Sequence, residues 1–340
     1  MLARTSITVV TATAVALSPA MAGPALLFDP ADGRVLYAED QDHQWHPASL
    51  TKIMTAYLVF EALREGKISL QDKVNCSELA HSQAPSRLGL PVGSEIAVET
   101  ALHALIVKSA NDAAIMLAEA IAGSQEAFVA RMNATAARLG MTRTLFMNAN
   151  GLPAPEQVTT ARDMAKLTVA ILRDFPNHAG LWAMPDMRVG KRRLRSHNAL
   201  LRIYEGGDGI KTGFICDSGF NMVASATRDG KRLAAVVLGE VTGRERSTRA
   251  ANLLEHGFQT YGWRVVLGSD NLFTLPMAED AKGVASIRHA VKSWACGTAR
   301  RPGRALARRA KKGKKGAAAA HKAAGRKQDT SVATPAKKSP

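Results

Sequence analysis

The sequence predicts an α+β fold, in which both ends of the catalytic region form an antiparallel β-sheet and a helical subdomain is inserted between them. Short β-rich runs lie near residue 30 and again between residues 210 and 241, whereas apolar positions from about 60 to 195 recur at three- and four-residue spacing. This order lacks the strand–helix alternation of a parallel sheet. Tight-turn sequences between neighbouring β-rich runs favour antiparallel pairing.

The first expected hairpin joins Ala25–Phe28 to Arg34–Tyr37. The intervening residues 29–33 have turn chemistry, because Pro presets φ and Gly tolerates positive φ. A helix is expected from Thr51 to Leu63, shortly after Pro47. Proline suits the start of a helix, since the N–H that it lacks would have no partner there.

The middle of the chain is expected to be helical. Apolar residues follow the helical period in Glu99–Leu105, Asp112–Ile121 and Gln125–Leu139, and again in Thr160–Leu172 after an N-cap-like threonine. No internal repeat is present. These segments make up the predicted helical insertion, from about residue 60 to 195.

The period changes to that of β-strands after residue 209. Strands are expected at Ile210–Ile215, Phe220–Ala226 and Leu233–Val241, and the Asp-Gly pair at 229–230 is a strong signal for a tight hairpin. Helical spacing returns from Arg246 to Tyr261. We therefore expect one catalytic domain that spans residues 23–265.

Residues 1–22 have the pattern of a signal peptide. Arg4 supplies the positive charge, Ile7–Leu17 is uncharged and apolar or small, and Ala20–Ala22 gives a small-x-small cleavage pattern. The run has about half of the ~20 residues that a membrane span needs. A buried N-terminal strand is the alternative. We expect an exported, periplasmic or envelope-associated protein whose mature form has no transmembrane span.

The net charge of +16 is concentrated at the C-terminal end. Residues 299–340 hold fourteen Lys or Arg residues and one acidic residue, a net charge of +13, which leaves +3 for the first 298 residues. With few large apolar residues, this basic tail is predicted to be disordered. Export argues against nucleic acid as its partner and favours an anionic membrane or wall polymer. Residues 266–298 are expected to form a poorly defined connector.

Cysteine spacing gives little information. Cys76, Cys216 and Cys296 are an odd number, far apart and without metal-like spacing. We interpret them as buried or incidental thiols, although export would permit a disulfide. His43 and His46 have H-x-x-H spacing without further ligands, and we interpret them as loop residues.

The first of three short motifs is Ser49-Leu50-Thr51-Lys52. On a helix, positions i and i+3 share a face, so the hydroxyl and the amine can meet. Serine needs a nearby base to become a good nucleophile, and a lysine whose pKa is lowered by burial or by neighbouring cations can be that base. By itself the motif also fits a helix start with a surface lysine.

The second motif is Ser109-Ala110-Asn111, and the third is Lys211-Thr212-Gly213. In the second motif, the serine hydroxyl suits a proton relay, and the asparagine amide suits hydrogen bonding to a peptide group. Taken alone, this motif also fits the N-cap of the helix that follows. Lys and Thr on a strand suit a substrate carboxylate, and Gly lets a peptide approach the backbone closely. A nucleotide P-loop would need Gly where Ile210 stands, and a helix where we expect a strand.

The order S-x-x-K, S-x-N and K-T-G within 165 residues is far more specific than any one motif. It is the constellation of β-lactamases and penicillin-binding proteins. From about Leu26 to Val241, the chain closely resembles the low-molecular-mass penicillin-binding D-alanyl-D-alanine carboxypeptidases, serine peptidase family S11. The resemblance extends to stretches beyond the motifs, at residues 47–52, 148–153, 208–214 and 225–228.

The resemblance implies three catalytic roles. Ser49 would be the nucleophile, which forms an ester with the carbonyl of the penultimate D-Ala. Lys52 would be its base, and Ser109 would pass a proton to the amine of the leaving D-Ala. No metal or organic cofactor is implied.

The resemblance also implies the groups that bind substrate. Asn111 would hold the substrate backbone, Lys211 and Thr212 would bind the terminal carboxylate, and Gly213 would let the peptide approach. The backbone N–H groups of Ser49 and Phe214 would form the oxyanion hole. The implied ligands are peptidoglycan stem peptides and β-lactam antibiotics, with roles in cell-wall biogenesis and cell shape.

The chain departs from the family in two ways. Many members carry a second, all-β domain and an amphipathic helix that rests on the membrane. Here about 30 residues between the last catalytic helix and the basic tail leave no room for a β domain, and the tail has no apolar face. Cys216 also stands where the family often has a small hydroxyl residue.

Four functions remain open, and a D-Ala-D-Ala carboxypeptidase is preferred. A D,D-endopeptidase that cuts cross-links would use the same catalytic groups. A β-lactamase would need a second carboxylate base, and no Glu-x-x-Leu-Asn-like loop is present. A wall- or polyanion-binding protein that acts through its basic tail is the candidate from outside the enzymes.

Overall fold

The computed structural model describes residues 23–267 and 270–297. The predicted signal peptide, residues 1–22, and the predicted basic tail, residues 299–340, lie outside these residues. By its internal contacts the chain divides into two units, Met1–Val291 and Lys292–Pro340, and each is described by itself.

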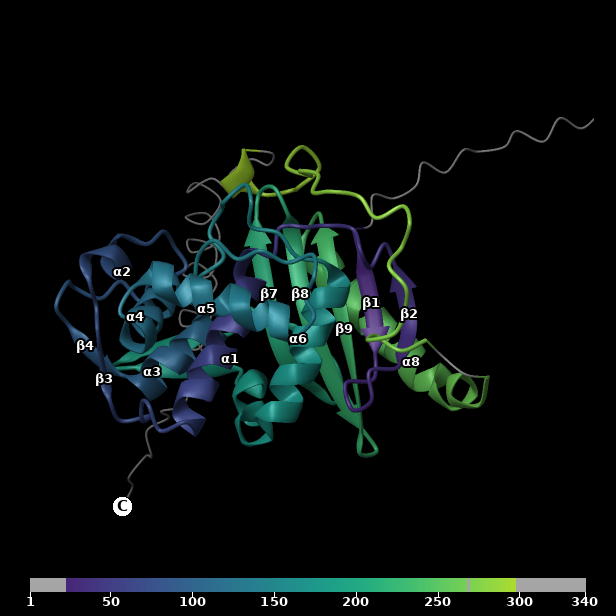
Figure 1. Ribbon diagram of the computed structural model, residues 1–340, viewed down its shortest axis with the longest axis horizontal. Coiled ribbons are helices and arrows are strands. Elements are labelled where there is room, and N and C mark those ends of the chain that lie inside the picture. The colour runs from purple at the N-terminus through teal and green to yellow at the C-terminus, as the bar shows by residue number, and fades with distance from the viewer. Residues whose placement is uncertain (1–22, 268–269, 298–340) are drawn as a thin grey trace, which may run out of the picture. The chain divides into compact units, whose positions relative to one another are not determined.

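A five-stranded sheet is the centre of the first unit (Figure 1). Its strand order is β2-β1-β9-β8-β7, and every neighbouring pair is antiparallel. Both ends of the catalytic region therefore meet in one sheet, which confirms the predicted α+β class. The strands are β1 (Ala25–Phe28), β2 (Val35–Glu39), β7 (Gly207–Ile215), β8 (Gly219–Arg228) and β9 (Lys231–Glu240).

The helices predicted in the middle of the chain are present. Between β2 and β7 the major ones are α1 (Thr51–Arg64), α3 (Val98–His103), α4 (Asn111–Ala122), α5 (Gln125–Arg138) and α6 (Ala161–Asp174), and α8 (Gly243–Leu267) follows the sheet. Among the described residues, no single helix is long and apolar enough to cross a bilayer. Helices α4 and α5 reach the required length and composition only when taken together, and the two are bent by 85° relative to each other.

Several short elements were not predicted. The helix expected over Glu99–Leu105 is divided, because α3 passes into a π-helical turn, η2 (Ala104–Lys108), whose wider turn brings Ser109 to its end. The others are only three to eight residues long, too short for an apolar period to be detected. They are η1 (Ala48–Leu50), β3 (Lys73–Asn75), α2 (Glu78–Ser82), β4 (Glu95–Ala97), η3 (Pro176–Ala183), β5 (Asp186–Val189), β6 (Arg192–Arg195) and α7 (Leu200–Ile203).

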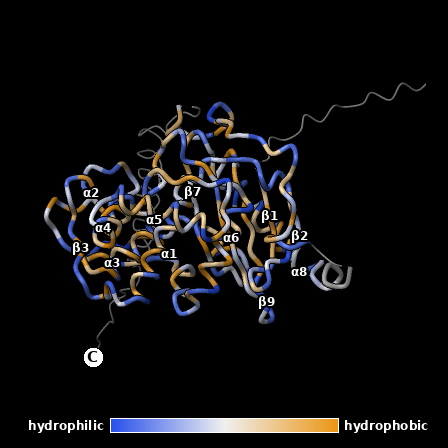
Figure 2. Tube along the Cα trace, viewed as in Figure 1, coloured by the Kyte–Doolittle hydropathy of each residue, from blue (hydrophilic) through white to orange (hydrophobic). Residues whose placement is uncertain are grey.

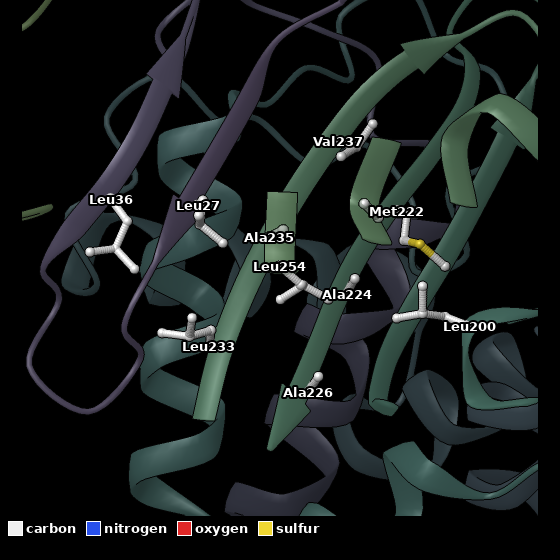
Figure 3. Packing of buried hydrophobic residues seen from close by; sticks show 11 residues of the cluster. Leu27, Leu36, Leu200, Met222, Ala224, Ala226, Leu233, Ala235, Val237 and Leu254 are labelled. Atoms are coloured by element: carbon white, nitrogen blue, oxygen red, sulfur yellow. The ribbon is translucent and has the colours of Figure 1, made fainter. Parts of the chain in front are cut away.

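Helices cover both faces of the sheet, with α6 on one face and α8 on the other (Figure 1). Beneath α8, Leu254 packs with Leu27 and Leu233 of the strands (Figure 3). A Cβ at Gly257 would stand 2.8–2.9 Å from these two strand leucines, so glycine lets the helix lie close. Figure 2 shows apolar residues along the strands and the facing helices, with hydrophilic residues on the outer loops.

Residues 270–291, which the sequence suggested as a connector, belong to the first unit. Leu272 donates its N–H to the Gly33 carbonyl at 2.7 Å and is buried. The buried Arg162–Asp42 ion pair holds the segment further along, because Arg162 also donates to the carbonyls of Leu275 and Pro276. The described part of the second unit contains the 3₁₀ turn η4 (Trp294–Cys296).

The interpretation of the cysteines was wrong for two of the three. Cys216 and Cys296 are disulfide-bonded, whereas Cys76 is a free, buried thiol. Disulfide formation depends on where the fold places each sulfur, and the sequence separation of the cysteines carries no such information.

Candidate active site

Ser49 and Lys52 lie together at the junction of η1 and α1. The Lys52 Nζ donates to Ser49 Oγ at 3.1 Å, and the lysine is 1% exposed. A buried base is thus in hydrogen-bond contact with a hydroxyl, as nucleophilic activation requires.

The Lys52 ammonium has two further acceptors. Nζ lies 2.7 Å from the Asn111 Oδ1 and also donates to the carbonyl of Asn150. Burial lowers the pKa of Lys52 well below its ordinary value, the nearby Lys211 charge lowers it further, and Asp112 opposes the shift. A lysine with so low a pKa is poised to accept a proton.

Ser109 reaches the same centre from the end of the π-helical turn. Its backbone is left-handed, with φ 58° and ψ 38°, and its Oγ accepts a 2.8 Å hydrogen bond from Lys211 Nζ. The N-cap of α4 is Ala110, which has no side-chain capping bond. The alternative N-cap explanation of the Ser-Ala-Asn motif therefore does not hold for the described helix.

Asn111 is the first residue of α4, and the protein engages both ends of its amide. Oδ1 accepts from Lys52, and Nδ2 donates to the Ala84 carbonyl at 2.7 Å. One amide hydrogen remains for another acceptor. The geometry thus gives Asn111 a role in holding Lys52, beyond the predicted hold on a substrate.

Strand β7 runs directly beside Ser49. A Cβ on Gly213 would stand 2.9 Å from the Pro47 carbonyl oxygen and 3.2 Å from the Ser49 nitrogen. Asn221 of β8 fixes the same segment, because its buried amide donates to the carbonyls of His46 and Pro47. The sheet therefore sets the position of Ser49, and glycine is needed where the strand passes it.

These groups open into one cavity of about 360 Å³. Lys52 and Lys211 are almost fully buried, and their hydrogen bonds reach the lining hydroxyls of Ser49 and Ser109. All eight residues proposed from the sequence are thus at one place. The lining residues are Ser49, Pro85, Ser86, Ser109, Asn111, Gly151, Leu152, His197, Thr212, Gly213, Phe214, Ile215, Phe220 and Arg246.

Arg246, which the sequence did not single out, is the main addition. It is 7% exposed, and its Nε is buried without a hydrogen-bond partner among the described residues. Burial lowers the pKa of Arg246 to about 10, and burial together with Arg246 lowers the pKa of Lys211 to about 7. The cavity therefore has an excess of positive charge, which suits an anionic ligand.

His197 is the second addition. It lies at the exposed rim of the cavity, where desolvation by the surrounding protein and then Lys211, Lys108 and Arg246 lower its pKa to about 4. No local sequence signal marks His197 or Arg246, since neither belongs to a short motif.

His43 and His46 have separate partners. The His43 ring contacts the Asp280 carbonyl at 3.2 Å, and the His46 ring contacts the Gln157 carbonyl at 2.8 Å. Both lie on the loop between β2 and η1, as the sequence suggested.

The burial of Lys211 predicts how stability depends on pH. The pKa of Lys211 falls from its ordinary 10.5 to about 7 on folding, so the unfolded chain binds more protons between these pH values. Burial of the charged Lys211 amine lowers the free energy of unfolding. This loss of stability is complete below about pH 7 and disappears as the pH rises toward 10.5. We expect Lys211→Met to gain stability relative to wild type at pH 7, and to lose that advantage by pH 10.

Urea unfolding at several pH values checks this, with exposed Lys73→Met as the matched control. A stability difference between Lys211→Met and wild type that does not change with pH would contradict the burial of a charged Lys211.

Comparisons with known proteins identify the family of the chain. The family described as D-alanyl-D-alanine carboxypeptidase matches residues 10–242. The D-alanyl-D-alanine carboxypeptidase DacC of Escherichia coli is 40% identical over 243 residues, which are 69% of this chain and 61% of that protein. The chain thus spans about three fifths of the length of such curated relatives.

Solved structures show the same fold. Penicillin-binding protein 5 of Haemophilus influenzae has a TM-score of 0.68 and 36% identity, and the match covers 72% of this chain and 73% of that one. The cefotaxime-bound form of penicillin-binding protein D2 from Listeria monocytogenes has a TM-score of 0.64 and 32% identity, with 70% and 97% covered.

Proposed function

The chain belongs to the D-alanyl-D-alanine carboxypeptidase family, and we propose that it is a serine-type D-Ala-D-Ala carboxypeptidase of peptidoglycan stem peptides. The observation that carries the proposal is the hydrogen bond from the buried, low-pKa Lys52 to Ser49 Oγ. That contact supplies a base for acyl transfer at the mouth of a cationic cavity.

Acylation follows from these contacts. Neutral Lys52 takes the proton of Ser49, and Oγ attacks the carbonyl carbon of the penultimate D-Ala. The N–H groups of Ser49 and Phe214 stabilise the negative oxygen that forms. Collapse of this intermediate breaks the peptide bond. Ser109 gives its proton to the departing amine of D-Ala and takes up the proton that Lys52 removed from Ser49, so Lys52 is neutral again.

Deacylation uses the same groups in reverse. A water molecule gives a proton to Lys52 and attacks the ester on Ser49. The serine oxygen leaves and recovers a proton from Lys52, so the shortened peptide is released and the enzyme returns to its first state. Lys211, whose Nζ lies 2.8 Å from Ser109 Oγ, holds the Ser109 hydroxyl in place by its hydrogen bond.

Positive charge in the cavity explains selection of a free C-terminal carboxylate. Lys211, Thr212 and Arg246 come from β7 and the start of α8, and the Arg246 Nε has no protein acceptor among the described residues. A carboxylate fits because a buried cation without a partner is costly. The same feature suits the carboxylate of a β-lactam, and we expect penicillins to acylate Ser49.

Arg246→Ala is expected to raise the KM for a D-Ala-D-Ala peptide by roughly 10-fold or more, because a charged hydrogen bond is lost. Its kcat should change much less, since Arg246 contacts neither Ser49 nor Lys52. Steady-state kinetics of peptide hydrolysis measure the split. Arg244→Ala, an exposed arginine on the same helix, is the matched control. An unchanged KM would remove Arg246 from carboxylate binding.

Product analysis with purified wall fragments tests the proposed activity. Release of free D-Ala from monomeric stem peptides supports a carboxypeptidase. Conversion of cross-linked dimers to monomers without release of D-Ala would replace it with a D,D-endopeptidase.

We further propose export to the periplasm and a tether formed by the basic residues 299–340. The tail has a net charge of +13, and each Lys or Arg near an anionic membrane contributes roughly 1 kcal/mol. Salt screens such attraction, because the Debye length is only about 8 Å at physiological ionic strength. We therefore expect full-length protein to sediment with envelopes at low salt and to leave them at high salt without detergent.

A version that ends at Gly297 is the comparison, and it should stay soluble at both salt concentrations while it hydrolyses a soluble D-Ala-D-Ala peptide at the full rate. Equal sedimentation of the two forms would leave the tail without a tethering role. Loss of hydrolysis on truncation would place the tail in the catalytic fold.

A further inference from the structure

The β5–β6 hairpin concentrates positive charge. Its ten residues, 186–195, contain five Lys or Arg residues and a single acid, Asp186, whereas the first 298 residues together carry a net charge of only +3. The cations are Arg188, Lys191, Arg192, Arg193 and Arg195.

The two faces of the hairpin differ. Met187 pairs with Leu194, and both are buried. On the opposite face Arg188 lies directly across from Arg193, and both are exposed. Like charges at directly opposed positions destabilise a strand pair, so the folding of the hairpin does not account for this arrangement.

One carboxylate, Asp186, lies on this outer face, directly across from Arg195. Asp186 forms a 2.5 Å ion pair with Arg193. Among the residues that the structure describes, no ion pair within 4.0 Å is found for Arg188 or Arg195. Both remain exposed and available to an anion from outside.

The hairpin adjoins the cavity. Arg192 on its inner face donates to the Leu88 carbonyl at 3.2 Å, two residues beyond the cavity-lining Ser86. The Ser196 N–H bonds to the Pro185 carbonyl at 2.9 Å and closes the base of the hairpin. The next residue is His197, which lines the cavity.

The side of the cavity can be identified from the charges around His197. His197 lines the same cavity as Thr212 and Arg246. Lys211, Lys108 and Arg246 act on its ring, and Lys211 and Arg246 are the cations that we assign to the carboxylate of the departing residue. The hairpin therefore begins beside the residues that we assign to the leaving group, and Arg195 lies two residues before the cavity-lining His197.

We propose that the outer face of the β5–β6 hairpin, formed by Arg188, Arg193 and Arg195, binds carboxylates of an acidic peptide attached to the nitrogen of the scissile bond. The inference rests on the proposed function and extends it to leaving groups longer than one D-Ala. Binding energy remote from the reacting bond then favours cross-linked acidic peptides over the smallest substrate.

The test uses Arg188→Gln/Arg195→Gln and three substrates. The first is a small D-Ala-D-Ala peptide without side-chain charge. The other two are cross-linked dimers with the same scissile bond, one with free carboxylates in the leaving peptide and one with those carboxylates amidated. Lys73→Gln/Arg131→Gln is the matched control, because both residues are exposed on β3 and α5, which contribute nothing to the cavity.

We expect the hairpin variant to raise KM for the acidic dimer by roughly 3- to 20-fold, as two weak exposed charge contacts would. Its kinetics on the amidated dimer and the small peptide should match wild type. The wild-type preference for the acidic dimer should also decline with added salt.

Three results would overturn the inference. The first is an equal rise in KM of the hairpin variant on the acidic and the amidated dimer. The second is a KM on the acidic dimer that equals that of the control variant. The third is loss of binding to an anionic wall polymer while the kinetics on all three peptides stay unchanged. Wild type that releases D-Ala from the small peptide but cleaves neither dimer would also overturn it, while the proposed carboxypeptidase stands. Failure to hydrolyse any of the three would instead remove the proposed function.

Discussion

Ser49→Ala is expected to form no covalent adduct with a penicillin and to lose at least about 10⁴-fold in peptide turnover, as removal of a catalytic nucleophile does. Ser49 Oγ accepts a hydrogen bond from Lys52, the residue that we propose as the base. No ester can form without this oxygen. The substitution should leave the fold intact, because the backbone of this segment is held by Asn221 rather than by the serine side chain.

Intact-mass measurement after incubation with the drug gives the result directly. Wild type should gain the mass of one penicillin, and the partly buried Ser94→Ala control should do the same. An adduct on the Ser49→Ala variant, or its absence from wild type, would show that another residue reacts or that none does.

Lys52→Ala is expected to slow acylation by roughly 10² to 10⁴-fold, the usual contribution of a general base. Wild-type acylation should rise with pH through the lowered pKa of Lys52, because the neutral amine is the active form. The variant lacks this amine, so its acylation rate should no longer rise with pH in this range. Stopped-flow measurement of acylation across a pH series gives both the rate and its dependence on pH.

Lys52→Arg separates the base from its positive charge. Arginine keeps the cation and much of the volume but does not deprotonate in proteins, so it should be as slow as the alanine variant. Lys73→Ala on the exposed surface controls for loss of a lysine. Acylation of Lys52→Ala near the wild-type rate, in a folded protein, would remove Lys52 as the base.

The sequence alone determined the features that depend on local geometry. Ser49 and Lys52 could be paired because a helix places positions i and i+3 on one face, and the structure has them 3.1 Å apart. The Asp-Gly turn at 229–230 joins β8 to β9 for an equally local reason, since its residues tolerate positive φ. The order of β-rich and helical segments was enough for the α+β class.

Tertiary structure decided which distant groups share the site. The acceptor for Lys52 at the Asn150 carbonyl lies 98 residues away, and the contact of Ser109 with Lys211 spans 102. The motifs suggested that Ser109 and Lys211 act together, but a carbonyl has no residue type to recognise, so Asn150 could not be found. Arg246 and His197 also lack a local pattern, because only the packing of α8 and the β5–β6 base beside β7 brings them to the cavity.

The same limit applies to the charged hairpin. Its basic residues are plain in the sequence, where they suggest no more than a solvated surface. Their direction is decided by the pairing of Met187 with Leu194, which buries one face and turns Arg188 outward. Strand register and long-range packing depend on contacts between residues far apart in the chain, and a local pattern cannot contain them.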